Sequence, residues 1–343
     1  MFLGILMFMQ KEIEVRGKMG LSIKKFPRIN NEACLYCFDD CIATIAEEMQ
    51  FDYELMYLTF FDIEFLYGRN ESQKLGGNLK LNFPQRYENL AKNHGVHIVD
   101  VDVRNNKENA IMLLESEIEQ GNKCIVYFDP YWCPWDLQYK RNHETLSGHS
   151  LVVIDVEDDG IHMADPYFEY SEKIMSFNHF EQGVLNILAL HKDENFYLTD
   201  GDLYKKLKSS LFEIKSKNTL KDFMQIYNNF CLCEDIHSEV QDNVSYFMSP
   251  VCVNFLLINQ AICYYSVALR KIANYFSSGD NQLEDFAQQL WSIGKDWSYF
   301  RMMMRIDYFS TKIIDKKVLD NKLKSIVYKQ QEVFYELFEK YCN

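Results

Sequence analysis

The sequence predicts an α+β domain followed by an all-α domain. Two observations carry this prediction. Alternating, β-branched strand patterns are confined to residues 95–192, and segments with helical period fill the chain from about residue 200 to its end. A helical pattern also precedes the strands. Helices and strands that are segregated along a chain, rather than alternating, are typical of α+β folds.

The first expected helix covers residues 37–50, because its apolar side chains recur on one face. An aromatic-rich segment follows and also has the pattern of a helix. Further on, a β-branched alternation predicts a strand, and an amphipathic segment that stops at Gly121 predicts a helix. In order, we expect helices at 37–50 and 52–67, a strand at 95–103, a helix at 105–120 and a strand at 123–129.

A β-hairpin is predicted next. Residues 149–157 and 161–165 read as strands, and Asp158-Asp159-Gly160 between them is a strong turn signal. Residues 184–192 predict one more strand, and the order favours a mostly antiparallel sheet.

Strand signals stop near residue 199, and the remaining segments are long and helical in period. Pro250 lies among them and should mark a helix boundary or a kink. We therefore expect three parts: an uncertain N-terminal extension at 1–25, a catalytic domain at 26–200 and a helical domain at 201–343. The predicted helical segments are 202–235, 236–278, 284–312 and 315–341.

Charge and cysteine content limit the class of protein. With 36 basic and 50 acidic residues the chain carries a formal charge of −14, which repels nucleic acid and anionic membranes and attracts small cations, or simply keeps the protein soluble. Several of the ten cysteines lie in apolar runs, which is typical of a reducing compartment. The apolar start MFLGILMFM lacks a basic region and is too short to span a bilayer. We expect a cytoplasmic protein with no nucleic-acid or membrane partner.

Three residues form a candidate catalytic triad. Cys37 stands where a helical pattern begins, and free N–H groups at a helix start stabilise a thiolate. His149 opens one strand of the predicted hairpin, and Asp165 closes the other. Because the start of one hairpin strand lies beside the end of its partner, Asp165 should hold the imidazole of His149.

Other residues compete with these or support them. Cys34 could replace Cys37, and the Cys34, Cys37 and Cys41 spacing could form a metal or redox cluster, although no second paired group has zinc-site spacing, so we expect no metal. His143 is the alternative base, and His162 is expected to face solvent. Three aromatic residues either line an acyl-binding pocket or only pack: Tyr131, Trp132 and Trp135.

Two segments resemble a known superfamily. CFDDCIATIAEEMQFDYELM (37–56) is similar to the cysteine helix of papain-like proteins of the C39 peptidase branch, and GHSLVVIDVEDDGIHMADPYF (148–168) is similar to their histidine strand, turn and Asp-Pro segment. The resemblance implies a Cys helix packed on an antiparallel sheet, with Cys37 as nucleophile, His149 as base and Asp165 as orienting acid. YFDPYWCPW (127–135) is similar to a segment of the butirosin biosynthesis protein H type of N-terminal domain.

That closer likeness implies an acyltransferase. Such domains pass an acyl group from a carrier-protein thioester to an amine. The papain-fold amide synthetases of nonribosomal antibiotic pathways, of the closthioamide type, use an amine acceptor in the same way. The peptidases carry Gln six residues before the cysteine and Gly after it, whereas this chain has Asn31 and Phe38. Asn31 can still donate a hydrogen bond to an oxyanion, but both differences disfavour peptidase activity.

The expected partners follow from this resemblance. They are an acyl or peptidyl carrier protein, which presents the donor on phosphopantetheine, and a small cationic amine such as a diamine or amino sugar; no other cofactor is expected. Two basic stretches, 204–217 and 316–329, either dock the acidic carrier or are solvated helix faces. The aromatic-rich helical domain is compatible with a homodimer. The alternatives are a cysteine peptidase or hydrolase with the same triad, and a binding module without activity.

Overall fold

The computed structural model describes the chain in two units. By their contacts, Met1–Phe26, Ala33–Phe51 and Val99–His191 form the first unit, and Pro27–Glu32, Asp52–Ile98 and Lys192–Asn343 form the second. Helices and antiparallel strands are both present, which confirms the α+β class. The residues described are 21–27, 36–66, 75–81, 86–143, 148–232, 236–240, 246–276, 280–310 and 314–342.

A six-stranded sheet organises the first unit, in the order β3-β8-β4-β5-β6-β7. β4 pairs with β8 and β5, and β6 with β5 and β7, all antiparallel. Five of these strands were predicted; the short, half-exposed β7 was not. The strands are β3 Val96–Asp102, β4 Lys123–Phe128, β5 His149–Glu157, β6 Gly160–Asp165, β7 Tyr170–Met175 and β8 Val184–Lys192.

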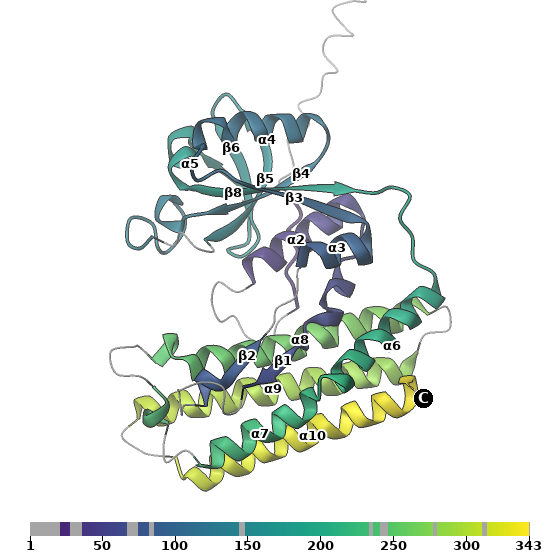
Figure 1. Cartoon of the computed structure of the whole chain (residues 1–343). Coiled ribbons are helices and arrows are strands. Elements are labelled where there is room, and N and C mark those ends of the chain that lie inside the picture. The colour runs from purple at the N-terminus through teal and green to yellow at the C-terminus, as the bar shows by residue number, and fades with distance from the viewer. Residues whose placement is uncertain are drawn as a thin grey trace, which may run out of the picture. The chain divides into compact units, whose positions relative to one another are not determined.

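Helices cover both faces of this sheet. Figure 1 shows α4 (Ala110–Glu119) on one face and α2 (Cys37–Met49) on the other. The apolar side of α4 joins the β-strand core through Leu114, next to buried residues of β4 and β5. A short helix, α5 (Phe177–Gly183), connects β7 to β8. α2 is buried along its first ten residues, as expected of a helix whose apolar face seals a sheet.

The predicted hairpin is present and sets the position of the candidate site. β5 and β6 pair with Val152 opposite Ala164, so His149 and Asp165 fall at the same end of the sheet. Gly148 precedes β5 with a φ of +63°, and a Cβ there would lie 2.7 Å from the Phe128 carbonyl oxygen. Only glycine fits this approach, which brings the start of β5 close against β4.

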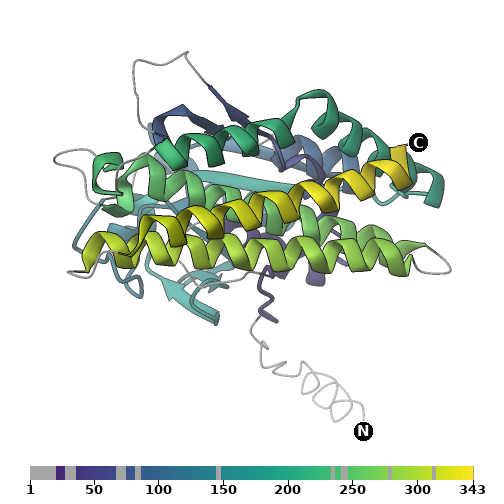
Figure 2. The ribbon, with the colours of Figure 1, turned by 90° about the horizontal axis from the view of Figure 1, so that it is seen from below.

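The second unit is mainly helical. Figure 2 shows its long helices running side by side, and α8 packs chiefly on α9. Pro250 is the first residue of α8, capped by Ser249, so the expected boundary is confirmed. The helices are α3 Arg86–His94, α6 Asp200–Ser216, α7 Thr219–Leu232, α8 Pro250–Tyr275, α9 Asn281–Phe309 and α10 Lys316–Cys342.

Two helix predictions are corrected. The segment 202–235 is not one helix, because Asn218 adopts a φ of +56° between α6 and α7. The segment 52–67 is a 3₁₀ helix, Glu54–Thr59, followed by β1 (Ile63–Phe65), which pairs with β2 (Leu79–Leu81). Aromatic packing prevails over the local period there, since the ring of Tyr57 stacks on Tyr264 of α8 at 4.5 Å.

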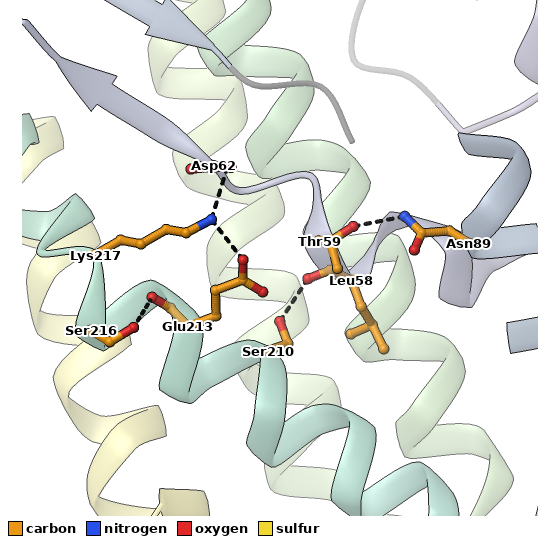
Figure 3. Close-up of polar contacts among 8 residues, drawn as sticks. All are labelled: Leu58, Thr59, Asp62, Asn89, Ser210, Glu213, Ser216 and Lys217. Carbon is orange, nitrogen blue, oxygen red and sulfur yellow. Dashed lines mark hydrogen bonds and ion pairs between the residues drawn. The ribbon is translucent and has the colours of Figure 1, made fainter. Parts of the chain in front are cut away.

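The division between the units differs from the expected boundary at residue 200. Residues Asp52–Ile98, expected in the first domain, have most of their contacts in the helical unit. Figure 3 shows two of these contacts: the hydroxyl of Ser210 donates to the carbonyl of Leu58 at 2.6 Å, and Lys217 pairs with Asp62 at 3.0 Å. Long-range pairing of this kind leaves no mark in hydrophobic periodicity.

One described helix, α8, is long and apolar enough to cross a membrane. However, 78% of its most apolar window is buried inside the helical unit. Such burial is typical of the core helix of a soluble protein.

Candidate active site

Cys37 is the first residue of α2, so the N-terminal end of a helix lies at its thiol. Its side chain is 6% exposed. Sγ lies 3.5 Å from the hydroxyl oxygen of Ser150, the second residue of β5. The charge and hydrogen bonding of the adjacent His149 lower the pKa of the thiol. The helix start and the beginning of β5 thus bring the sulfur of Cys37 to the hydroxyl of Ser150, the residue next to His149.

Asp165 holds the other side of the imidazole. Its Oδ2 lies 2.8 Å from Nε2 of His149, and both side chains are buried. Because Nε2 is used in this bond, Nδ1 is the ring nitrogen left for Cys37. The hairpin argument from sequence therefore agrees with the pairing found between the ring of His149 and the carboxylate of Asp165.

The electrostatics of the pair favour a thiolate facing an imidazolium. Burial of the Cys37 thiol is the largest influence and opposes ionisation, but the hydrogen bond and charge of His149 outweigh it, with help from Ser150. The pKa of Cys37 is therefore below its ordinary 9.0. Burial also opposes the charge on His149, yet the charge and hydrogen bond of Asp165 raise the pKa of His149 well above 6.5. Thiolate and imidazolium stabilise each other.

Trp135 is an additional polar partner of the site. Its Nε1–H donates to Oδ2 of Asp165 at 2.9 Å, the same oxygen that faces His149. The backbone N–H of Phe168 donates to Oδ1 at 3.3 Å. Donors thus reach both oxygens and fix the orientation of the carboxylate. Trp135 was expected either to line an acyl-binding pocket or only to pack, and its indole N–H donates to Asp165.

Aromatic rings surround the imidazole. The rings of Tyr167 and Phe168 lie 5.8 and 5.6 Å from that of His149, centroid to centroid. Both residues follow the Asp165-Pro166 pair, so the turn that ends β6 delivers the acid and the aromatic cover together. These rings limit water around the charged pair.

Cys41 lies on the same helix as Cys37, and Cys34 precedes Cys37 in the sequence. Cys41 is fully buried, and burial together with the negative charges around it raises the pKa of Cys41 well above 9.0. It behaves as a packed apolar residue, not as a second nucleophile. Cys34, the alternative nucleophile, and Asn31, the expected oxyanion donor, lie outside the described residues.

His143, the alternative base, does not contact the thiol within the part of the chain that is described. Its Nδ1 lies 2.7 Å from Oδ2 of the buried Asp129, and its ring stacks on Tyr131 at 3.8 Å. Tyr131 in turn meets Trp132 edge-on at 5.1 Å. Tyr131 and Trp132 therefore belong to an aromatic cluster around His143, next to the loop that carries Trp135.

His162 was expected to face solvent, and this is wrong: its side chain is 9% exposed. Its hydrogen bonds to Glu172 at 2.8 Å and to Asp159 at 2.9 Å raise the pKa of His162. With Glu157, the Asp159 and His162 ligand atoms lie close enough together to hold a metal ion. The histidine is already satisfied by carboxylates and the acids are exposed, so this cluster carries no metal assignment.

Sequence reasoning missed three features of the site: Ser150, the bond of Trp135 to Asp165, and the rings after Pro166. Ser150 directly follows His149, and the aromatic pair directly follows Asp-Pro, so local adjacency was a usable signal for both. The bond between Trp135 and Asp165 had no such signal, because thirty residues separate them.

Comparison with known proteins adds no relative. No family model matches the chain, and no curated protein matches it.

Proposed function

We propose that the protein is an acyltransferase that forms amide bonds through an acyl-enzyme on Cys37. The observation that carries the proposal is the geometry at the start of β5, where Sγ of Cys37 lies 3.5 Å from the hydroxyl of Ser150 and the adjacent His149 is held by Asp165 at 2.8 Å. A lowered thiol pKa, an imidazole in contact with the sulfur and an ionisable acid behind the ring are the three requirements of a cysteine nucleophile. The resemblance of these segments to papain-like acyltransferases supports the same assignment.

The first half-reaction loads the enzyme. The Cys37 thiolate attacks the carbonyl carbon of a carrier-protein thioester, and the tetrahedral intermediate collapses with cleavage of the C–S bond to pantetheine. His149 gives its proton to the departing pantetheine thiolate. The backbone N–H of Cys37, at the helix start, is one candidate donor to the oxyanion, and Asn31 is the other.

The second half-reaction transfers the acyl group. Neutral His149 accepts a proton as an amine attacks the acyl-enzyme, the amide forms, and the Cys37 thiolate is regenerated. Asp165 stabilises the imidazolium in both halves without taking its proton. Exchanging a thioester for an amide is downhill, so the cycle needs no ATP.

Transfer is favoured over hydrolysis by the surroundings of the ring. His149 is 5% exposed and is flanked by Tyr167, Phe168 and the loop of Trp135. A water-poor pocket slows hydrolysis of an acyl-enzyme and leaves it for a bound amine. The net charge of −14 attracts a cationic acceptor.

The test is how the acyl group is partitioned. Purified protein is given an acyl-S-pantetheine donor with and without a diamine, and the products are separated by chromatography and identified by mass. We expect the amide to dominate when the diamine is present and Cys37→Ala to form none. Cys231→Ala is the matched control, because that cysteine is exposed and should retain full activity. Free acid as the only product, whatever the amine, would overturn the transferase assignment in favour of a hydrolase.

A further inference from the structure

A groove of about 490 Å³ lies in the helical unit, where the junction of α6 and α7 meets the last turns of α10. Its floor is apolar and buried, and its rim is exposed and carries two cations and an aromatic ring. We call it the α6–α10 groove. The floor is formed by Ile214, Leu220 and Phe338, and the rim by Lys215, Lys221 and Tyr335.

The two rim lysines are available for a ligand. Among the described residues, neither Lys215 nor Lys221 has a carboxylate within ion-pair distance; Nζ of Lys215 instead lies 5.8 Å from the centroid of the Phe338 ring. Lys217, between them in sequence, turns away to Asp62 and Glu213, as Figure 3 shows.

The groove is therefore positive on an acidic protein. Glu339 is the one carboxylate among its lining residues, against the two unpaired lysines. The chain as a whole carries −14. A local reversal of charge beside an apolar floor is the pattern expected of a binding surface, because it attracts carboxylates that the rest of the molecule repels.

In the other basic stretch, residues 316–329, three of the five lysines form ion pairs. Lys316 pairs with Asp320, and Lys322 and Lys329 both pair with Asp296. The sequence could not separate the two basic stretches as docking candidates. The structure separates them, because the unpaired cations Lys215 and Lys221 line the groove. Among the described residues, the unpaired cations of 316–329, Lys317 and Lys324, do not line it.

We propose that the α6–α10 groove docks the carrier protein through an acidic amphipathic helix. An apolar side chain of that helix would enter between Tyr335 and the floor, and its flanking carboxylates would meet Lys215 and Lys221. This is the helix-in-groove mode, in which an apolar anchor supplies affinity and rim charges supply rate and orientation. The inference rests on the proposed function, since a carrier-borne donor is what requires such a dock.

The test compares two double charge reversals. K215E/K221E changes the groove, whereas K317E/K324E makes the same charge change at exposed lysines of α10 outside it. With an acyl-loaded carrier protein as donor, we expect KM to rise at least about tenfold for the groove variant and less than about twofold for the control. With free acyl-S-pantetheine, which has no helix to dock, both variants should match wild type, and this also shows that they fold.

Equilibrium titration of the same carrier protein, without turnover, separates the two proposals. If the wild type binds the carrier and K215E/K221E binds it much more weakly, the result supports docking at the groove, even if no donor reacts. In that case only the proposed function fails. The docking proposal would be overturned if the wild type did not bind the carrier. It would also be overturned if both variants lost affinity equally or if neither lost affinity.

Discussion

Replacing Asp165 by Asn tests how far the activation of Cys37 depends on the buried carboxylate. The side chain keeps its shape but loses the charge that faces Nε2 of His149 at 2.8 Å. With the charge centres about 4 Å apart and an effective dielectric constant of about 20, the attraction lost is about 4 kcal/mol. If about half of this reaches the thiol through the ring, the equilibrium constant for forming the Cys37 thiolate falls by about thirtyfold.

The assay is the rate of alkylation of Cys37 by iodoacetamide at several pH values, read from the peptide that carries the residue by mass spectrometry. In wild type, the reactive pair should persist between the lowered pKa of Cys37 and the raised pKa of His149, so alkylation should stay fast below the ordinary thiol pKa of 9.0. Asp165→Asn should react fast only as the pH approaches the ordinary thiol pKa of 9.0.

Asp136→Asn is the matched control. The charge of Asp136 also interacts with His149, but burial is the main influence and raises the pKa of Asp136. Among the described residues, its carboxylate accepts from the backbone N–H of Gln138 at 2.7 Å and not from the ring. We expect less than about a threefold change in alkylation at pH 6. If Asp165→Asn alkylated like wild type, or if both variants slowed equally, the dependence on the His149–Asp165 contact would be refuted.

Three further predictions concern stability. Trp135→Phe keeps the ring but removes the N–H donated to Asp165, so the free energy of unfolding, measured in urea, should fall by about 1.5–3 kcal/mol; a loss below about 0.5 would contradict the bond. Ser210→Ala removes the buried hydroxyl that donates to Leu58 at 2.6 Å, and should cost about 1–2 kcal/mol in the same assay, whereas an unchanged transition would count against that contact. His162→Gln should cost about 1 kcal/mol at pH 5.5, where the imidazolium is formed in both states, and progressively less as the pH rises through the raised pKa of His162; a loss that does not vary with pH would contradict the ion pairs.

The helix start at Cys37 and the pairing of His149 with Asp165 were predictable, because each follows from a local signal. A helix start at Cys37 follows from the apolar period of residues 37–50, and the hairpin follows from a turn signal between two β-branched runs. Antiparallel pairing then fixes which ends meet, so His149 and Asp165 had to fall together. The position of the helix start beside β5 was not predictable from these signals, and came only from the resemblance.

The orientation of the acid was not predictable. Trp135 lies in a loop without regular period, and its bond to Asp165 depends on how that loop folds over the end of the sheet. Nor did the sequence locate Asp52–Ile98, because the contacts that place it with the helical unit are long-range. Periodicity reports which face of an element is buried, but not against what it is buried.

The most direct test of the account is to trap the acyl group on the enzyme. Protein is mixed with acyl-S-pantetheine without any amine, quenched in acid within seconds, digested and analysed by mass spectrometry. The account predicts the acyl mass on the Cys37 peptide in wild type, much slower loading in His149→Ala, and no adduct elsewhere. An adduct on another cysteine, or an unmodified Cys37 under conditions in which the donor is consumed, would contradict it.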